Sequence, residues 1–179
     1  MLNPRLSTLI TMIGATAATR LLPHPPNMTS MIAVALFGGA YFSNRWLAFL
    51  VPLAALLASD LILGFYQHME ITYLSFALIV CIGLQLQQRR TGLRIAAAAL
   101  VSALVFFVIS NFGVWALGSM YPKTAAGLLA CYIAAIPFFR NMLVGDLLYT
   151  AILFGGFRLL EGHVAALRES GTAANSPAN

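Results

Sequence analysis

The sequence predicts an all-α membrane protein with six transmembrane helices and a short interfacial helix before the last one. Of its 179 residues, 60% are hydrophobic and 8% are charged, whereas soluble domains carry about 25% charged residues. The hydrophobic residues form runs of near-spanning length, separated by short segments with proline, glycine or charge. Since one span needs about 20 residues, we expect one transmembrane domain over residues 1–161 and a disordered cytoplasmic tail over 162–179.

The first three spans are separated by a proline loop and a tight reversal. The first apolar run is short, and Gly14 and Ala18 lie on one face of it, a spacing that lets another helix approach closely. Residues 23–27 include three prolines and cannot continue a helix. Segments with proline, glycine or charge, here and in the second half, divide the chain into six expected spans. They are expected over residues 6–22, 28–42, 45–66, 71–86, 95–117 and 142–160.

The second half begins with a basic connector, residues 85–94, and ends with a longer connection, residues 118–141. Within that connection, residues 124–139 are moderately apolar and about as long as a short span. They could form a seventh span, but we expect an interfacial helix that folds over a site at the outer face. Trp115 and Tyr121 fit the aromatic belt of a membrane interface.

The distribution of basic residues predicts the orientation. Six spans place the N-terminus, the second and fourth connections and the tail on one side. That side contains Arg5, Arg45, Arg89, Arg90, Arg94, Arg158 and Arg168, and the other contains only Arg20, Lys123 and Arg140. The positive-inside rule then places both termini in the cytoplasm of a bacterium, with the chain in the inner membrane.

Carboxylates inside apolar runs are the main functional signal. Asp60 lies near the outer end of the third span, and Asp146 lies near the outer end of the last. A charged group at this depth is costly and by default marks a functional pathway. Either carboxylate could pair with Arg140, and such a pair could be structural or could open to bind a polar ligand.

Histidines and amides add candidates on the same side. His24 and Asn27 lie in the first outer loop, His68 in the second outer turn, and Asn111 toward the outer end of the fifth span. Imidazole is a common ligand of transition metals, although a loop histidine is more often only solvated. A dedicated metal site of the protein itself is not expected.

Other function classes are disfavoured. The sequence lacks the nucleophile-elbow, Walker, zincin and dinucleotide-binding motifs, so we expect no enzyme and no cofactor of its own. Nucleic acid is not an expected partner, because the net charge of +5 comes from arginines in loops near lipid headgroups. Cys81 and Cys131 are expected to be buried free thiols.

Four phrases, at residues 36–42, 59–65, 111–115 and 136–146, resemble a bacterial membrane family of unassigned function. That family is related to the substrate-binding S components of energy-coupling-factor vitamin transporters, and the resemblance covers residues 5–160. It implies an S-component-like six-helix bundle with an outward site built from three outer loops. It also implies contact with an energy-coupling module through Gly14 and Ala18.

Within this group the sequence is most similar to the solitary BtuM-type proteins, predicted cobalamin transporters. The resemblance implies that His24, Asp60, Tyr73 and Arg140 surround the corrin, with His68 in place of a cobalt-ligating cysteine. The substrate-binding candidates are then His24, Asn27, Asp60, His68, Tyr73, Asn111, Arg140 and Asp146, with His68 as an axial ligand to the cobalt of the substrate.

The expected function is therefore uptake of a vitamin-type micronutrient, with cobalamin as the leading candidate, captured from the periplasmic side. Residues 121–141 and the first loop would form a mobile cover over the bound solute. Three alternatives remain open: a transporter of another micronutrient or a metal chelate, a structural or assembly subunit of a membrane complex, and a membrane enzyme.

Overall fold

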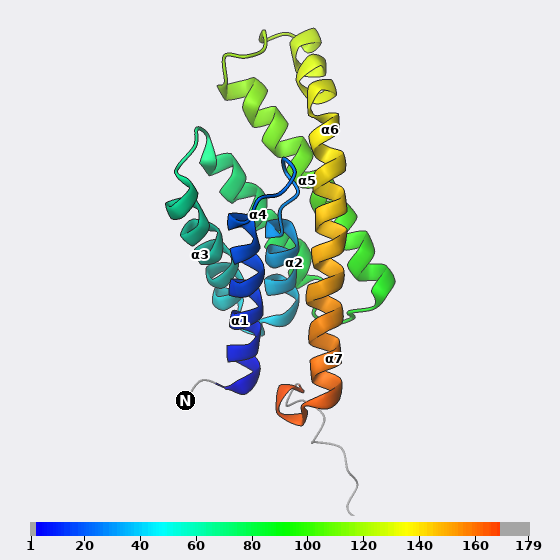
Figure 1. Cartoon of the computed structure of the whole chain (residues 1–179). Helices are drawn as coiled ribbons and strands as arrows, with labels where there is room; N and C mark the ends of the chain where they lie inside the picture. Colours follow the sequence, from blue (N-terminus) through cyan, green and yellow to red (C-terminus); the bar gives the residue numbers. More distant parts are fainter. Residues whose placement is uncertain (1–2, 169–179) are drawn as a thin grey trace, which may run out of the picture.

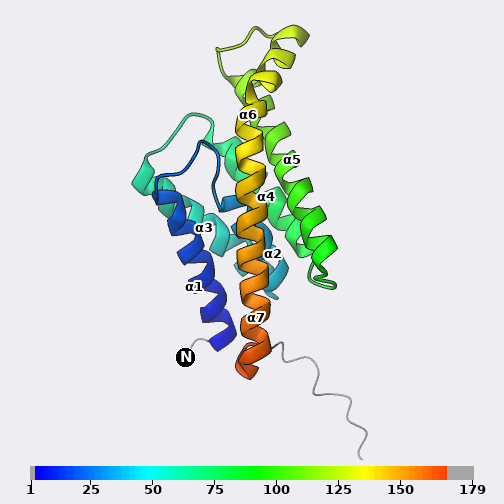
Figure 2. The ribbon, with the colours of Figure 1, turned by 45° about the vertical axis from the view of Figure 1, so that its right-hand side comes forward.

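The computed structural model describes residues 3–168, and all regular structure in that range is helical. The helices run alternately up and down (Figure 1). We call the end formed by connections 22–30, 64–68 and 118–124 the upper end. The lower end contains connections 42–44 and 85–91 and both ends of the described chain (Figures 1 and 2). The first five helices are α1 (Pro4–Ala18), α2 (Met31–Tyr41), α3 (Arg45–Leu63), α4 (Met69–Leu84) and α5 (Gly92–Leu117). The prediction of an all-α fold is confirmed for this part of the chain.

Side chains in the connections fix where several helices begin. The Asn44 side chain accepts a hydrogen bond from the Trp46 amide at 2.8 Å at the start of α3. Thr124 accepts one from the Gly127 amide at 3.1 Å at the start of the next long helix. These caps satisfy amides that have no partner within the helix. At the end of α3, Gly64 adopts a φ of 95°, and its amide bonds the Asp60 carbonyl at 2.8 Å.

Helix α2 is the centre of the molecule. All 11 of its residues are buried. At about 1.5 Å per residue it is roughly 16 Å long, about half the thickness of a bilayer core. A Cβ added at Gly39 would lie 2.3 Å from the Val80 carbonyl oxygen, and Gly39 lies directly against Gly83. Backbone therefore meets backbone between α2 and α4, which only glycine allows at this separation.

The last helical rod is continuous. Helix α6 (Ala125–Thr150) continues through a π-helical turn, η2 (Ala151–Gly155), into α7 (Gly156–His163). The expected interfacial helix over residues 124–139, separate from the last span, is therefore wrong: those residues form the first part of one rod of 39 residues.

Packing against α5 explains this continuity. The Tyr132 hydroxyl donates to the Val108 carbonyl at 2.8 Å, and the rings of Phe107 and Phe139 lie 4.7 Å apart. Pro137 removes one amide donor from α6, but the contacts on both sides of it hold the helix in line. Figure 1 shows the upper parts of α5 and α6 projecting beyond the other helices.

Among the residues that the structure describes, three helices are long and apolar enough to cross a membrane, namely Arg45–Leu63, Gly92–Leu117 and the rod Ala125–His163. The outward face of α5 carries an apolar stripe in which Leu100, Leu104, Val108 and Phe112 follow one another every four residues, all exposed. Such a face suits contact with lipid. Cys131 is buried as expected, but Cys81 is exposed, because it lies on the face of α4 opposite to Val80 and Gly83.

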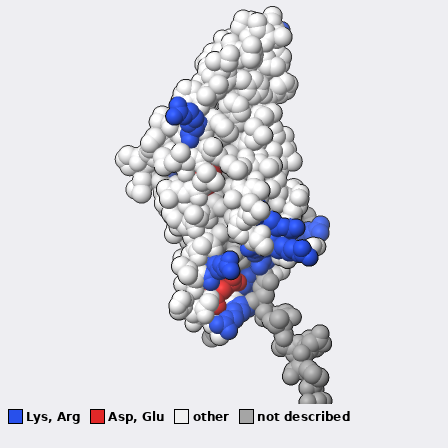
Figure 3. All heavy atoms as spheres, turned by 90° about the vertical axis from the view of Figure 1, so that its right-hand side faces the viewer, with Lys and Arg blue, Asp and Glu red and all other residues white. Residues whose placement is uncertain are grey.

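Basic residues gather at the lower end (Figure 3). Arg5 pairs with Glu161 at 2.5 Å and also donates to the Leu167 carbonyl. Residues 162–168, assigned to a tail by the sequence, are folded back here through a short 3-10 helix, η3 (Ala165–Leu167). The rest of that predicted tail lies outside the described residues.

Candidate functional site

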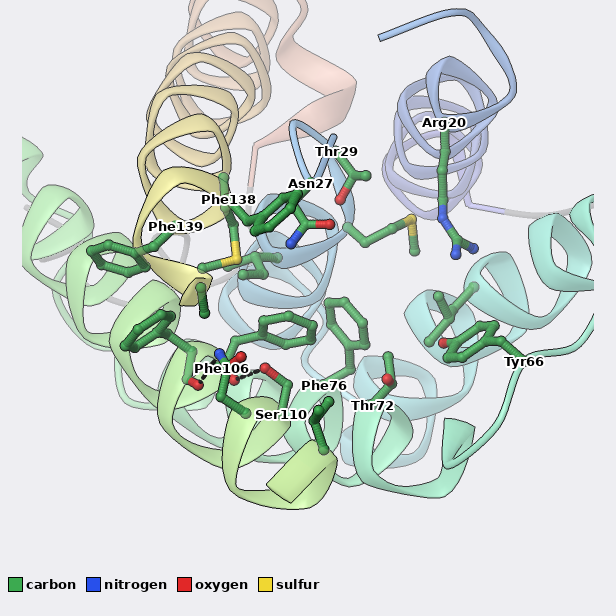
Figure 4. A pocket seen from close by; sticks show the side chains of 18 residues that line it. Arg20, Asn27, Thr29, Tyr66, Thr72, Phe76, Phe106, Ser110, Phe138 and Phe139 are labelled. Carbon is green, nitrogen blue, oxygen red and sulfur yellow. Dashed lines mark hydrogen bonds between the residues drawn. The ribbon is translucent and has the colours of Figure 1, made fainter. Parts of the chain in front are cut away.

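A cavity of 320 Å³ lies toward the upper end, lined by α2, α3, α4, α5 and α6 and by the connections after α1 and α3 (Figure 4). Its lining is mixed. The polar residues are Arg20, Asn27, Thr29, Tyr66, Thr72, Ser110 and Asn111, and the apolar ones are Met31, Ile32, Leu56, Phe76, Phe106, Phe107, Val114, Ala135, Phe138, Phe139 and Met142. Concave sites with an apolar body and a few polar groups are typical of small-molecule binding.

Arg20 is the charged group of the cavity. It lies in the 3-10 turn η1 (Thr19–Leu21), which continues α1 at the upper end. Its Nη1 donates to Asp60 Oδ1 at 2.5 Å and to Ser59 Oγ at 2.6 Å. Because a guanidinium has five N–H donors, these two bonds hold Arg20 in place and leave donor capacity toward the cavity.

Asp60 holds this arginine from the side away from the cavity. Its side chain is 0% exposed, and its second oxygen, Oδ2, accepts a hydrogen bond from the Tyr73 hydroxyl at 2.9 Å. Asp60 lies one turn before the end of α3, and Tyr73 lies in the first part of α4, so the short connection between these helices brings them together. A buried charge needs both a counter-ion and hydrogen bonds, and here it has both.

Tyr66 lies beside Arg20 on this polar side (Figure 4). Burial raises the pKa of its phenol, against the opposing effect of the Thr72 side chain. The hydroxyl therefore stays neutral at physiological pH and is able to donate a hydrogen bond to a ligand.

The loop over residues 22–30 covers part of the cavity. Asn27 adopts a φ of 62°, a left-handed conformation that asparagine tolerates better than most residues. The Asn141 side-chain amide of α6 donates to the Pro26 carbonyl at 3.2 Å, and Ser30 Oγ donates to the Thr16 carbonyl of α1 at 2.8 Å. These bonds hold the loop between α1 and α6, so that Asn27 and Thr29 line the cavity.

Aromatic side chains form the opposite wall (Figure 4). Phe76 of α4 and Phe106 of α5 have ring centroids 5.3 Å apart, and Phe107 and Phe139 form a second pair. The Asn111 amide, within the same wall, donates to the Phe107 carbonyl at 2.8 Å. Aromatic pairs at these distances stabilise one another beyond the area they bury, so this wall is preformed.

The candidates from sequence fall into three groups. Asn27 and Asn111 line the cavity. Asp60 and Tyr73 lie one contact behind it, through Arg20. The other four lie outside its lining: His24, His68, Arg140 and Asp146.

Those four have different surroundings. His24 is exposed in its loop, and the His68 ring lies 3.4 Å from Glu70 in a turn. Arg140 is exposed and does not form the expected pair, because the partner of Asp60 is Arg20. Asp146 is buried in α6 below the cavity. No group of three or more His, Cys, Asp or Glu that could hold a metal ion occurs within residues 3–168.

Sequence reasoning missed Arg20 and the aromatic wall. Arg20 had a usable signal, because it is the only Asp, Glu, Lys or Arg between Arg5 and Arg45. The phenylalanines had none, since an aromatic residue in an apolar run is normally ordinary packing or lipid contact. Their convergence depends on the antiparallel register of α5 and α6.

The chain was compared with known proteins. Neither the curated proteins nor the solved structures gave a match. One family model, described as a family of unknown function, DUF6580, matches residues 1–167, which is nearly the whole chain. The chain therefore belongs to the DUF6580 family, whose function its description leaves open.

Proposed function

We propose that this protein is a bacterial inner-membrane uptake protein that captures a small organic solute in the cavity at its upper end. The observation that carries the proposal is the cavity itself. It combines a preformed aromatic wall with a guanidinium that a buried carboxylate and hydroxyl hold in place. A bundle with only a structural role would not need such a charged, partly open hollow.

The lining indicates the class of solute. Phe76, Phe106, Phe107, Phe138 and Phe139 favour a flat ring. Arg20, opposite this wall, favours a carboxylate or another hydrogen-bond acceptor on the same molecule. We therefore propose a ring-containing micronutrient with an acidic or strongly accepting group.

The size of the cavity selects among the transport alternatives. Its volume of 320 Å³ is at the lower end of the roughly 300–1,000 Å³ typical of drug-sized ligands. Cobalamin, a macrocycle with an attached nucleotide, is far larger than that class. The geometry thus favours a vitamin smaller than a corrin, an alternative left open by the resemblance to vitamin-transporter S components.

The orientation follows from the distribution of charge. Most basic residues lie at the lower end (Figure 3), and the residues that line the cavity lie toward the upper end. By the positive-inside rule the lower end faces the cytoplasm. In this proposal the six alternating rods are six spans, with the short α2 enclosed by the others, and the solute enters from the periplasm.

Binding tests the proposal directly. The protein in lipid nanodiscs is mixed in turn with each of a panel of water-soluble vitamins and their precursors, and its melting temperature is measured. We expect one compound to raise the melting temperature in the wild type. Phe107→Ala and Asn111→Ala, which change the cavity lining, should abolish or strongly reduce that rise.

Arg140→Ala provides the matched control, since Arg140 is exposed outside the cavity. It should retain the full shift. Two results would contradict the proposal: no response to any compound, or a response that Phe107→Ala and Arg140→Ala reduce equally. The first would favour the structural or assembly role.

A further inference from the structure

Asp146 is a buried carboxylate for which the described residues offer no partner. It is 1% exposed, and neither Oδ1 nor Oδ2 has a hydrogen-bond partner. Thr150 follows four residues later on the same face of α6, is 4% exposed, and has an equally unpartnered hydroxyl. Almost all buried polar atoms in proteins are hydrogen-bonded, so two orphaned groups one turn apart require an explanation.

The neighbouring elements bring no opposite charge. The adjacent Gly145 packs against Met28, to which an added Cβ would come within 3.0 Å, and the only titratable residue of that loop, His24, is exposed. Helix α2, packed against α6, has Tyr41 as its only titratable residue, at the lower end. Helix α5 has only Arg94, exposed in its first turn, and the nearest titratable group on α6 is the half-buried Tyr149.

Asp60 shows how this protein compensates the charge of a buried carboxylate. Asp60 has Arg20 on one oxygen and the Tyr73 hydroxyl on the other. An ionised carboxylate without such partners is very costly in an apolar interior. Asp146 therefore has to be neutralised in another way, and a proton is the one cation that needs no further oxygen ligands.

The position of Asp146 connects it with the cavity and with a local irregularity of the helix. Met142, four residues earlier on the same face, lines the cavity, so Asp146 lies roughly 6 Å below it along the helix. The π-helical turn η2 begins directly after Thr150. Such turns are rare and often lie at functional sites.

We propose that Asp146, with Thr150 beside it, is an exchangeable proton-binding site in the interior of the bundle, directly beneath the solute cavity. The carboxylate oxygen accepts a proton to form a neutral acid and releases the same proton when the site opens to water. Only an O–H bond forms and breaks, with no change of oxidation state. That this proton couples to solute uptake rests on the proposed function, whereas the proton site itself does not.

Infrared difference spectroscopy of the protein in lipid nanodiscs tests the site without any solute. At neutral pH the wild type should show the carbonyl stretch of a protonated carboxylic acid, and this band should shift in heavy water as the proton exchanges. Asp146→Asn should lose the band. Asp146→Glu should move it, which keeps the test decisive if the asparagine variant folds poorly.

Glu70→Gln is the matched control, because Glu70 is a carboxylate whose side chain is 64% exposed and lies outside the cavity lining, so that its removal should leave the band unchanged. Three results would overturn the proposal: no protonated-acid band in the wild type, a band that Asp146→Asn leaves unchanged, or a band that heavy water does not shift. A melting temperature raised by sodium chloride over choline chloride in the wild type but not in Asp146→Asn would assign the site to sodium instead. Failure of the vitamin panel would leave all these results unaffected and would count only against uptake.

Discussion

Arg20 gives the cavity its charge, and its position depends on Asp60, which does not line the cavity. Arg20 is 15% exposed and Asp60 is 0% exposed, and the two share a salt bridge of 2.5 Å. Ser59 and Tyr73 supply further hydrogen bonds to the two partners. Asp60 therefore acts as a positioning residue, and of these two partners only Arg20 lines the cavity and would contact a ligand there.

Removing one partner of this pair should be more harmful than removing both. Asp60→Asn leaves Arg20 without its counter-ion, and breaking a buried ion pair in this way costs about 3–5 kcal/mol. The double variant Arg20→Met with Asp60→Asn leaves no unpaired charge and should recover much of that loss. Thermal unfolding in nanodiscs measures both. An Asp60→Asn protein as stable as the wild type would show that the pair does not hold Arg20.

At the scale of single residues, the sequence predicted which polar groups lie at or near the cavity better than it predicted which residues they pair with. Asp60 is recognisable because it is a carboxylate in an apolar run, and Asn27 and Asn111 because they are polar residues toward the outer side. The expected pairing with Arg140 is not formed, since Arg140 lies on an exposed face of α6. Which face of a helix turns inward depends on packing, and a run that is apolar all round carries no periodic signal of it.

At the scale of elements, the contact between α2 and α4 sets the centre of the bundle. Gly39 and Gly83 lie against each other, with added Cβ atoms meeting backbone on both sides. Backbone atoms cannot move aside as a flexible side chain can. The tight contact thus lets the short helix α2 remain wholly enclosed.

Gly39→Ala should destabilise the protein by about 1–3 kcal/mol, the usual range for overpacking a well-packed interior. Gly14→Ala is the control, because nothing lies within 4 Å of an added Cβ there. Alanine is favoured over glycine within a helix by about 1 kcal/mol, so the control should be neutral or slightly stabilised. Unfolding midpoints in a denaturing detergent compare the two. Equal effects would show that α2 and α4 do not meet this closely.

The last helical rod shows where helix-breaking and polar residues in a sequence can suggest a connection that the structure does not contain. Pro137, Arg140 and Asn141 together resemble a connection between two helices. In the structure the proline is accommodated and the two polar residues lie on the surface of a continuous α6. The packing of Phe139 and Tyr132 against α5 outweighs the local signals, and contacts between distant segments are not readable from one sequence.

A distance measurement separates the two descriptions of this segment. Spin labels at the exposed Leu129 and Leu148, nineteen positions apart, should lie about 28 Å apart along a straight helix. An interfacial helix meeting the last span at a right angle near residue 140 would reduce this to about 20 Å. Double electron–electron resonance in nanodiscs resolves that difference, and a maximum near the shorter value would restore the separate helix.

At the scale of the whole molecule, the sequence predicted that successive helices run in opposite directions, but it did not predict which helices pack side by side. The boundaries of the first five helices agree with the expected runs to within a few residues, because prolines, glycines and charged turns separate them. That α2 lies in the centre, with all of its residues buried, has no counterpart in the sequence. Its composition would equally suit a lipid-facing span, and only its shortness set it apart.

The orientation of the bundle gives the last prediction, which is read by cysteine labelling. Both native cysteines are first replaced, by Cys81→Ser and Cys131→Ser, because Cys81 is exposed. Single cysteines are then placed at two exposed sites at opposite ends, His24→Cys and Gln88→Cys. A membrane-impermeant maleimide added to spheroplasts should label the first, and should label the second only after the membrane is permeabilised. The arginines of the lower end favour this result, since the cytoplasmic side retains positive charge. The reverse pattern would turn the cavity toward the cytoplasm and remove capture from outside, whereas labelling of both sites in intact spheroplasts would mean that the bundle does not cross the membrane in this way.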